Sequence, residues 1–132
     1  MKVARGESLC LYAMGHYVKI VLFSVIGVVA TIIAIYYGSF YIMPSVTVIN
    51  HSGAKINLFE ISLPNSNLDF GPIEMGHKNT LHYSLSQADG VYRYRFITHD
   101  SVSLNGECGY LTQHEINKRV SITVTPNEVV CD

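Results

Sequence analysis

One uncharged, apolar run near the N-terminus, residues 20–42, constrains this chain more than any other feature. As an α-helix these residues extend roughly 34 Å, because each adds about 1.5 Å, and a bilayer's hydrocarbon core is about 30 Å thick. Many of them are β-branched Val and Ile, which weaken helices in water. Inside lipid, however, every backbone N–H and C=O must find an internal partner, and that requirement favours a helix. The run therefore predicts a transmembrane helix.

A cleaved secretory signal is the alternative interpretation of this run. Signal peptides have hydrophobic regions of about 7–15 residues that end in a small-x-small cleavage site. This run is longer and ends in Tyr36, Tyr37, Phe40 and Tyr41, side chains typical of a membrane interface. We therefore interpret it as a retained signal anchor and divide the chain into a tail (1–17), a transmembrane helix (18–43) and an outer domain (45–132).

The charges that flank the run predict its orientation. The N-terminal side carries Lys2, Arg5 and Lys19 against Glu7, so 3 − 1 gives +2, whereas residues 45–132 carry six basic and nine acidic side chains, so 6 − 9 gives −3. Basic flanks stay on the cytoplasmic side. We expect a single-pass protein of a cell membrane, a bacterial inner membrane given the small size, with a cytoplasmic N-terminus and a periplasmic outer domain. No nucleic-acid partner is expected.

The three cysteines fall on different sides of this membrane. Cys108 and Cys131 share the oxidising outer side, and Cys10 is isolated on the reducing side, so the simplest pairing is a Cys108–Cys131 disulfide. Closing that loop contributes roughly 3 kcal/mol of stability in the chain-entropy model. Two free thiols, or an intermolecular bridge, are the alternatives.

Alternating hydrophobicity after Pro44 predicts a β-rich outer domain. Strand-like alternation occurs in residues 45–50, 54–64, 80–85, 91–97, 101–104, 107–110 and 120–124. Turn residues separate these segments, and Asn105-Gly106 is the strongest hairpin signal. The predicted fold class is mainly β: a single N-terminal transmembrane helix and then a small antiparallel β-sandwich of about seven strands, immunoglobulin-like or transthyretin-like.

Local irregularities of this pattern carry further predictions. The parity of the apolar residues changes between Leu58 and Phe59, as a β-bulge would produce, and Gly109 within a strand also indicates a bulge or a close backbone approach. The one helical signal is the capping-box pattern of Thr112 and Glu115, which predicts a turn or two of helix. Asn50 begins an N-glycosylation sequon that we attribute to chance, because it lies close to the membrane.

Small residues within the helix indicate a packing face. Ala30, Ala34 and Gly38 are spaced by four, and Gly27 lies one turn earlier on nearly the same side. Small-xxx-small spacing lets a second helix approach closely. We expect this face to contact another membrane or envelope protein, or a second copy of the chain.

The outer domain shows no catalytic or metal-binding motif. It lacks HExxH, GxSxG and SxxK patterns, and we expect no enzyme activity, metal or cofactor. The alternative is an envelope hydrolase or metal-dependent enzyme built from scattered side chains, namely His77, His82, His99, His114, Glu74 and Glu115. A third hypothesis, a pH sensor, requires a histidine buried in the sandwich.

Arg93 and Arg95 lie on the polar parity of one predicted strand, opposite Tyr92, Tyr94 and Phe96. Two planar cations on one face are candidates for contact with a carboxylate-rich partner or with lipid headgroups, although a solvated strand face has the same pattern. The sequence therefore favours a non-enzymatic, membrane-tethered module that binds a protein partner: an accessory subunit of an envelope complex, or an inhibitor or immunity-type protein.

Overall fold

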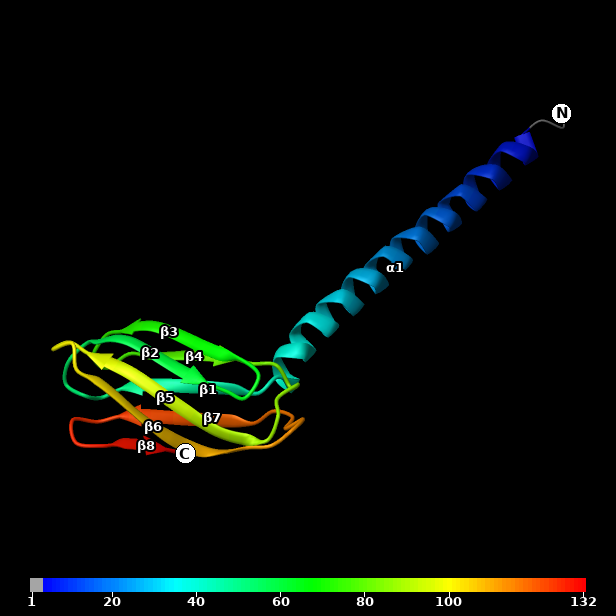
Figure 1. Ribbon diagram of the computed structural model, residues 1–132. Coiled ribbons are helices and arrows are strands. Elements are labelled where there is room, and N and C mark those ends of the chain that lie inside the picture. The colour runs from blue at the N-terminus through cyan, green and yellow to red at the C-terminus, as the bar shows by residue number, and fades with distance from the viewer. Residues whose placement is uncertain (1–3) are drawn as a thin grey trace. The chain divides into compact units, whose positions relative to one another are not determined.

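A computed structural model describes residues 4–132 of the protein, with side chains from Met14 onward. Within these residues one helix precedes eight strands (Figure 1). The elements are α1 (Ala4–Ile42), β1 (Ser45–Asn50), β2 (Ile56–Ser62), β3 (Asn67–Ile73), β4 (Lys78–His82), β5 (Gly90–Thr98), β6 (Ser103–Leu111), β7 (Arg119–Val124) and β8 (Val129–Cys131). The chain divides into two compact units, of which the first ends at Ser39 and the second is Phe40–Asp132.

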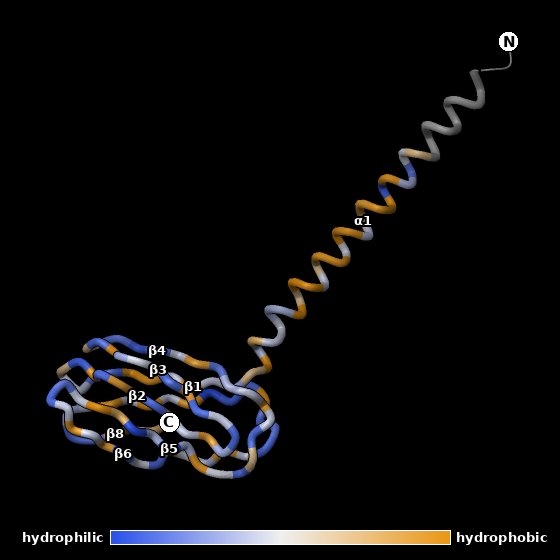
Figure 2. The backbone as a smooth tube through the Cα atoms, turned by 45° about the horizontal axis from the view of Figure 1, so that its top comes forward, coloured by the Kyte–Doolittle hydropathy of each residue, from blue (hydrophilic) through white to orange (hydrophobic). Residues whose placement is uncertain are grey.

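α1 contains one stretch, Met14–Ile42, that is long and apolar enough to cross a membrane. Figure 2 shows the hydrophobic colour concentrated along this part of the helix. Its serine and threonine hydroxyls are satisfied locally: Ser24, Thr31 and Ser39 donate to the carbonyls of Ile20, Gly27 and Tyr36 at 2.9, 2.8 and 2.7 Å. Their hydroxyl protons therefore need no partner outside the helix, which suits a lipid environment.

The second unit is a sandwich of two four-stranded sheets, as Figure 1 shows. One sheet has the order β4-β1-β7-β8 and the other β3-β2-β5-β6. Neighbouring strands are antiparallel except for β1 and β7, which are parallel. The predicted mainly β class is confirmed. The parallel pair places the first strand of the domain at the centre of its sheet, between two strands that come much later in the chain.

Apolar side chains from both sheets fill the space between them. Phe59 lies among three other rings, with centroid distances of 6.0 Å to Phe70, 5.6 Å to Phe96 and 6.2 Å to Tyr94. The strand parities predicted to face inward are confirmed, because these side chains are buried: Val46, Val48, Ile56, Phe59, Ile61, Leu63, Tyr83, Tyr92, Phe96, Val120, Ile122 and Val124. Tyr94 is partly buried against them.

Both predicted bulges are present. The pairing of β2 with β5 shifts register between Ile56 and Leu58, so that Phe59 and Ile61 face inward. In β6 the register shifts beside Gly109, whose φ of 55° lies in the left-handed region that glycine adopts without steric cost. Each bulge thus keeps the apolar side chains of its strand on the core side.

The predicted hairpin at Asn105-Gly106 is wrong, because both residues lie inside the continuous strand β6. Gly106 pairs with Tyr94 of β5, and a Cβ atom added at position 106 would collide with the Tyr94 hydroxyl and ring. The glycine therefore serves side-chain packing and does not form a turn. The turn between β5 and β6 lies at residues 99–102, where the Ser101 N–H donates to the Thr98 carbonyl at 3.0 Å.

Three further details differ from the sequence expectations. Strands β3 and β8 were not predicted, and the segments predicted at 101–104 and 107–110 form the single strand β6, so the described chain has eight strands and not about seven. In β3, Pro72 interrupts the pattern because it has no N–H to donate, and the strand tolerates it because β3 is at a sheet edge, where one side of the strand needs no donor. The predicted helix at Thr112 does not form: its hydroxyl donates to the Glu115 carboxylate at 2.5 Å, and the segment folds as turns.

Candidate functional site: the outer face of β2, β5 and β6

The polar face of one sheet contains the two arginines singled out in the sequence. Two rows of residues cross the strands, Ser62–Arg93–Glu107 and Glu60–Arg95–Asn105, in the order β2, β5, β6. We call these six residues the β5 polar face. Arg93 and Arg95 are exposed and lie on the opposite side of β5 from the buried Tyr92 and Phe96, which confirms their predicted parity.

The two arginines differ in their ionic contacts. The Arg93 Nε donates to Glu107 Oε1 at 3.1 Å, with side chains 70% and 60% exposed, so this pair contributes little to stability. Arg95 forms no ion pair with any described residue, although Glu60 is its register neighbour on β2. Arg95 is therefore the cation of this face that is available to an outside carboxylate.

A hollow of about 340 Å³ lies along this face, and Arg93, Arg95, Asn105 and Glu107 line it. A second hollow of about 590 Å³ adjoins it, is lined by Leu63, Pro64 and Val91, and shares Ser62, Arg93 and Glu107 with the first. The face thus offers a cation, an amide and carboxylates beside a small apolar edge. That composition suits contact with a polar segment of another protein.

A buried tyrosine pair is the most perturbed titratable group of the described sandwich. The hydroxyls of Tyr83 and Tyr92 are 2.6 Å apart, and desolvation by burial raises the pKa of both, further for Tyr92. A tyrosine that acts as a general base needs a lowered pKa. The pKa values of this pair are shifted in the opposite direction, and we interpret the two side chains as part of the core packing.

The scattered side chains of the enzyme alternative do not come together. His77 and His99 lie in turns at one end of the sandwich, and His82 and His114 lie at the end where the chain enters β1. The two carboxylates are in separate ion pairs, Glu74 with Lys55 and Glu115 with Lys118, each at 2.6 Å. Across the described residues no three His, Cys, Asp or Glu side chains form a metal-binding group.

The pH-sensor hypothesis requires a buried histidine. The outer-domain histidines, which also include His51, are all exposed in the described sandwich. None of them thus lies in the core, as this hypothesis requires.

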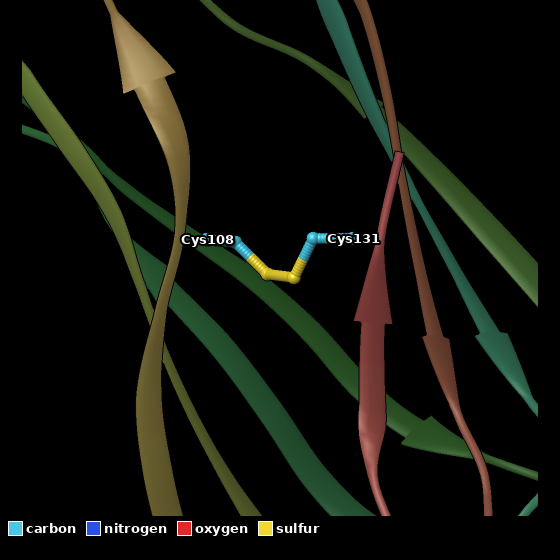
Figure 3. Close-up of a disulfide and its surroundings, with 2 residues drawn as sticks. All are labelled: Cys108 and Cys131. Carbon is cyan, nitrogen blue, oxygen red and sulfur yellow. A yellow bond between two sulfur atoms is a disulfide. The ribbon is translucent and has the colours of Figure 1, made fainter.

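The structure contains the predicted disulfide between Cys108 and Cys131, with Cα atoms 5.8 Å apart (Figure 3). The two cysteines belong to β6 and β8, the edge strands of different sheets. The bond therefore joins the two layers at one open side of the sandwich. The side chain of Cys10, predicted to be an isolated thiol, lies outside the described part of the chain.

Asn50, the first residue of the sequon, is fully buried. Its amide donates to the carbonyls of Ala54 and Ile73 at 2.8 and 2.9 Å, and its Oδ1 accepts from the backbone and hydroxyl of Ser52. The amide nitrogen that a glycan would need is thus engaged inside the domain. The residue organises the turn after β1.

Among the small residues of α1, Gly27, Ala30 and Ala34 are exposed along the helix, and Gly38 is half-buried. A Cβ atom added at Gly27 or Gly38 would meet nothing within 4 Å. The face is therefore open to a neighbour, and the packing contact remains a prediction.

Arg119 was not singled out in the sequence, yet it caps the end of α1. Its guanidinium donates to the Met43 carbonyl at 2.7 Å, to the Ser45 hydroxyl at 3.0 Å and to the Phe40 carbonyl at 3.5 Å. A helix ends with carbonyls that lack intrahelical partners and carry partial negative charge, which a cation stabilises. No sequence signal reveals this contact, because 76 positions separate Arg119 from Met43.

Comparison with known proteins supports the fold only. No protein-family model matches the chain, and a search of curated proteins finds no match. The solved NMR structure of a protein from Eubacterium rectale is similar, with a TM-score of 0.51 and 7% sequence identity, and the match covers 68% of this chain and 86% of that one. At that identity the likeness concerns the arrangement of the strands and carries no information about activity.

Proposed function

We propose that the protein is a non-enzymatic, single-pass membrane protein whose outer sandwich binds a protein partner. α1 is its signal anchor, its N-terminus lies in the cytoplasm, and the sandwich lies in the periplasm of a bacterial cell. The basic N-terminal flank and the acidic outer domain support this orientation. The partner is another membrane or envelope protein, because a sandwich that begins directly after the anchor reaches only a short distance.

Arg95 is the observation that carries the binding proposal. An exposed guanidinium with no ion pair in the described chain, beside Asn105 and a hollow of about 340 Å³, can form a two-pronged contact with a carboxylate. Arg93 is paired with Glu107, so it lines the hollow but is not a free cation. We infer that the partner presents an acidic side chain to the β5 polar face.

A matched pair of charge reversals tests this proposal in the full-length protein. Arg95→Glu changes the exposed cation of the β5 polar face, and Lys78→Glu changes an exposed cation on β4 of the other sheet. The protein is extracted from its own membrane in mild detergent, and co-purifying proteins are quantified by mass spectrometry. We expect Arg95→Glu to lower recovery of the specific partner about tenfold or more, since a hydrogen bond to a charged group contributes roughly 1.5–3 kcal/mol.

Lys78→Glu is expected to leave recovery unchanged. Equal recovery with both variants would contradict the assignment of binding to the β5 polar face. Both positions are exposed, so the sandwich domains of the two variants should have similar unfolding midpoints.

A further inference from the structure

The segment between β6 and β7, residues 112–118, is a loop held in one conformation by charged contacts. The Glu115 carboxylate accepts from Thr112 at 2.5 Å and lies 2.6 Å from Lys118 Nζ, which also donates to the Tyr110 carbonyl. Desolvation raises the pKa of Glu115, but the hydrogen bonds from Lys118 and Thr112 outweigh it and the pKa is lowered. The carboxylate is therefore charged and paired at neutral pH.

Backbone geometry also defines the loop. His114 and Asn117 have φ values of 60° and 54°, and the Gln113 N–H donates to the Asp89 carboxylate at 2.9 Å. Residues in this left-handed region persist where surrounding contacts hold them. Hydrogen bonds and an ion pair thus hold the 112–118 loop in the conformation described.

The loop is hydrogen-bonded to the end of the candidate membrane span. The Asn117 N–H donates to the carbonyl of Ile42, the last residue of α1, at 2.9 Å, and the Ser45 N–H donates to the Lys118 carbonyl at 2.9 Å. Arg119, the next residue, caps the carbonyl of Met43. The loop and the end of the span therefore belong to one packed unit, which includes residues from Phe40 onward.

Ile116 is the exposed apolar residue of this loop, with 68% of its surface accessible. Its neighbour in the chain, Asn117, bonds to Ile42, which is itself 48% exposed, and Tyr41 is 75% exposed. Removing an isoleucine side chain from water is favourable, and tyrosine favours the boundary between lipid and water. These three side chains form what we call the collar patch.

We propose that the collar patch docks into the surface of the membrane that α1 spans, with Ile116 inserted among the lipid headgroups and upper acyl chains. The occupant is lipid because the patch includes Tyr41 and Ile42, the last two residues of the candidate span Met14–Ile42, where a span ends at the interface. This proposal rests on the membrane placement of α1 given above. It assigns the 112–118 loop a contact with the membrane in addition to that of the anchor.

The sequence contains no tryptophan, so one substitution creates a single fluorescent reporter. Three full-length variants are reconstituted in phosphatidylcholine vesicles: Ile116→Trp in the loop, Val29→Trp within α1, and Val102→Trp in the turn at the opposite end of the sandwich. Val102 is 52% exposed and is the matched control for an apolar residue outside the patch. Each variant is measured with lipids brominated at shallow or at deep acyl positions.

We expect the Ile116→Trp emission to be blue-shifted and quenched more by shallow than by deep bromines, as befits insertion to about 5–10 Å. Val29→Trp should be quenched more by deep bromines, and Val102→Trp should emit as in water without quenching. An unquenched Ile116→Trp beside a quenched Val29→Trp would overturn the docking proposal and leave the anchor intact.

Two other outcomes also decide the matter. Absence of quenching in both Ile116→Trp and Val29→Trp would overturn the membrane placement itself, and the docking proposal with it. A blue-shifted Ile116→Trp emission that bromines do not quench, and that disappears when the protein is diluted in lipid, would assign the patch to a second copy of the chain and overturn lipid docking. Near-ultraviolet circular dichroism of the tyrosines checks that each variant is folded.

Discussion

Two tyrosine hydroxyls, on Tyr83 and Tyr92, are buried together in the core of the sandwich. Desolvation raises the pKa of both above the value near 10 of an unfolded chain. Because the folded pKa values are the higher ones, their contribution to stability is complete below about pH 10 and is lost as the pH rises toward them. Each tyrosine should cost up to about 1.4 kcal/mol per pH unit in that range.

Tyrosinate absorbance against pH measures this effect. We expect Tyr83 and Tyr92 to ionise in a separate late step, when the sandwich unfolds at high pH, because burial raises the pKa of both. The double variant Tyr83→Phe/Tyr92→Phe should lose that late step and retain more stability at alkaline pH. A single titration step for all nine tyrosines of the chain, with the fold intact, would contradict the assignment.

Residue parity was predictable where the cause is local. Arg93 faces outward and Phe96 inward because strand side chains alternate, whatever the partner strand is. Gly106 and Arg119 were not predictable. The first accommodates the Tyr94 ring of the neighbouring strand, and the second caps a carbonyl far away in the chain, so both roles depend on the folded arrangement.

The Cys108–Cys131 disulfide joins two secondary-structure elements, the edge strands β6 and β8. β8 has three residues and pairs only with β7, and the bond from Cys131 to Cys108 joins it covalently to the other sheet. Cys131→Ser or Cys108→Ser should lower the free energy of unfolding by about 2–4 kcal/mol. Denaturation of the full-length protein in detergent measures the loss.

Hydrogen exchange separates this local effect from a global one. In Cys131→Ser we expect faster exchange at the paired amides of β8 and at Asp132, whose N–H donates to the Ser121 carbonyl at 2.9 Å. Membrane insertion should be unaffected. Mass mapping that finds the Cys108 and Cys131 thiols both free in protein from its native compartment would contradict the disulfide.

Strand identity followed from the sequence where the alternation is clear. β1, β5 and β7 each have at least six residues, and β2 alternates on either side of one bulge. β3 contains Gly71-Pro72, and β8 is too short to show a period, so neither was predicted. The parallel pairing of β1 with β7 was also missed, because pairing between distant strands depends on the whole topology. For the same reason, the sequence does not predict the strand register that places Glu60, Asn105 and Glu107 beside Arg93 and Arg95.

At the scale of the whole molecule, the charge asymmetry predicts the orientation. A reporter enzyme that is active only outside the cytoplasm, fused after Asp132, should be active, because the flank with Lys2, Arg5 and Lys19 stays inside. The same reporter fused to the N-terminus should be silent. Cytoplasmic localisation of the C-terminal fusion would reverse the proposed topology, and the β5 polar face would then meet a cytoplasmic partner.

The helix face of Gly27, Ala30, Ala34 and Gly38 can be separated from the sandwich experimentally. Gly38→Leu and Ala34→Leu add bulk where a neighbouring helix would approach, and overpacking costs about 1–3 kcal/mol. Lipid tails provide no hydrophobic drive that could offset this loss. We therefore expect recovery of the partner to fall roughly tenfold, with an unchanged unfolding midpoint for the sandwich.

Val29→Leu is the control, because Val29 is exposed and lies roughly 140° around the helix from Ala34 at 3.6 residues per turn. Equal recovery from all three leucine variants would mean that α1 acts as an anchor alone. Combined with the charge reversal at Arg95, the outcome assigns recognition: sensitivity to Gly38→Leu alone places the partner within the membrane, and sensitivity to Arg95→Glu alone places it outside. Additive losses from both would mean that one partner contacts helix and sandwich at distant, independent sites.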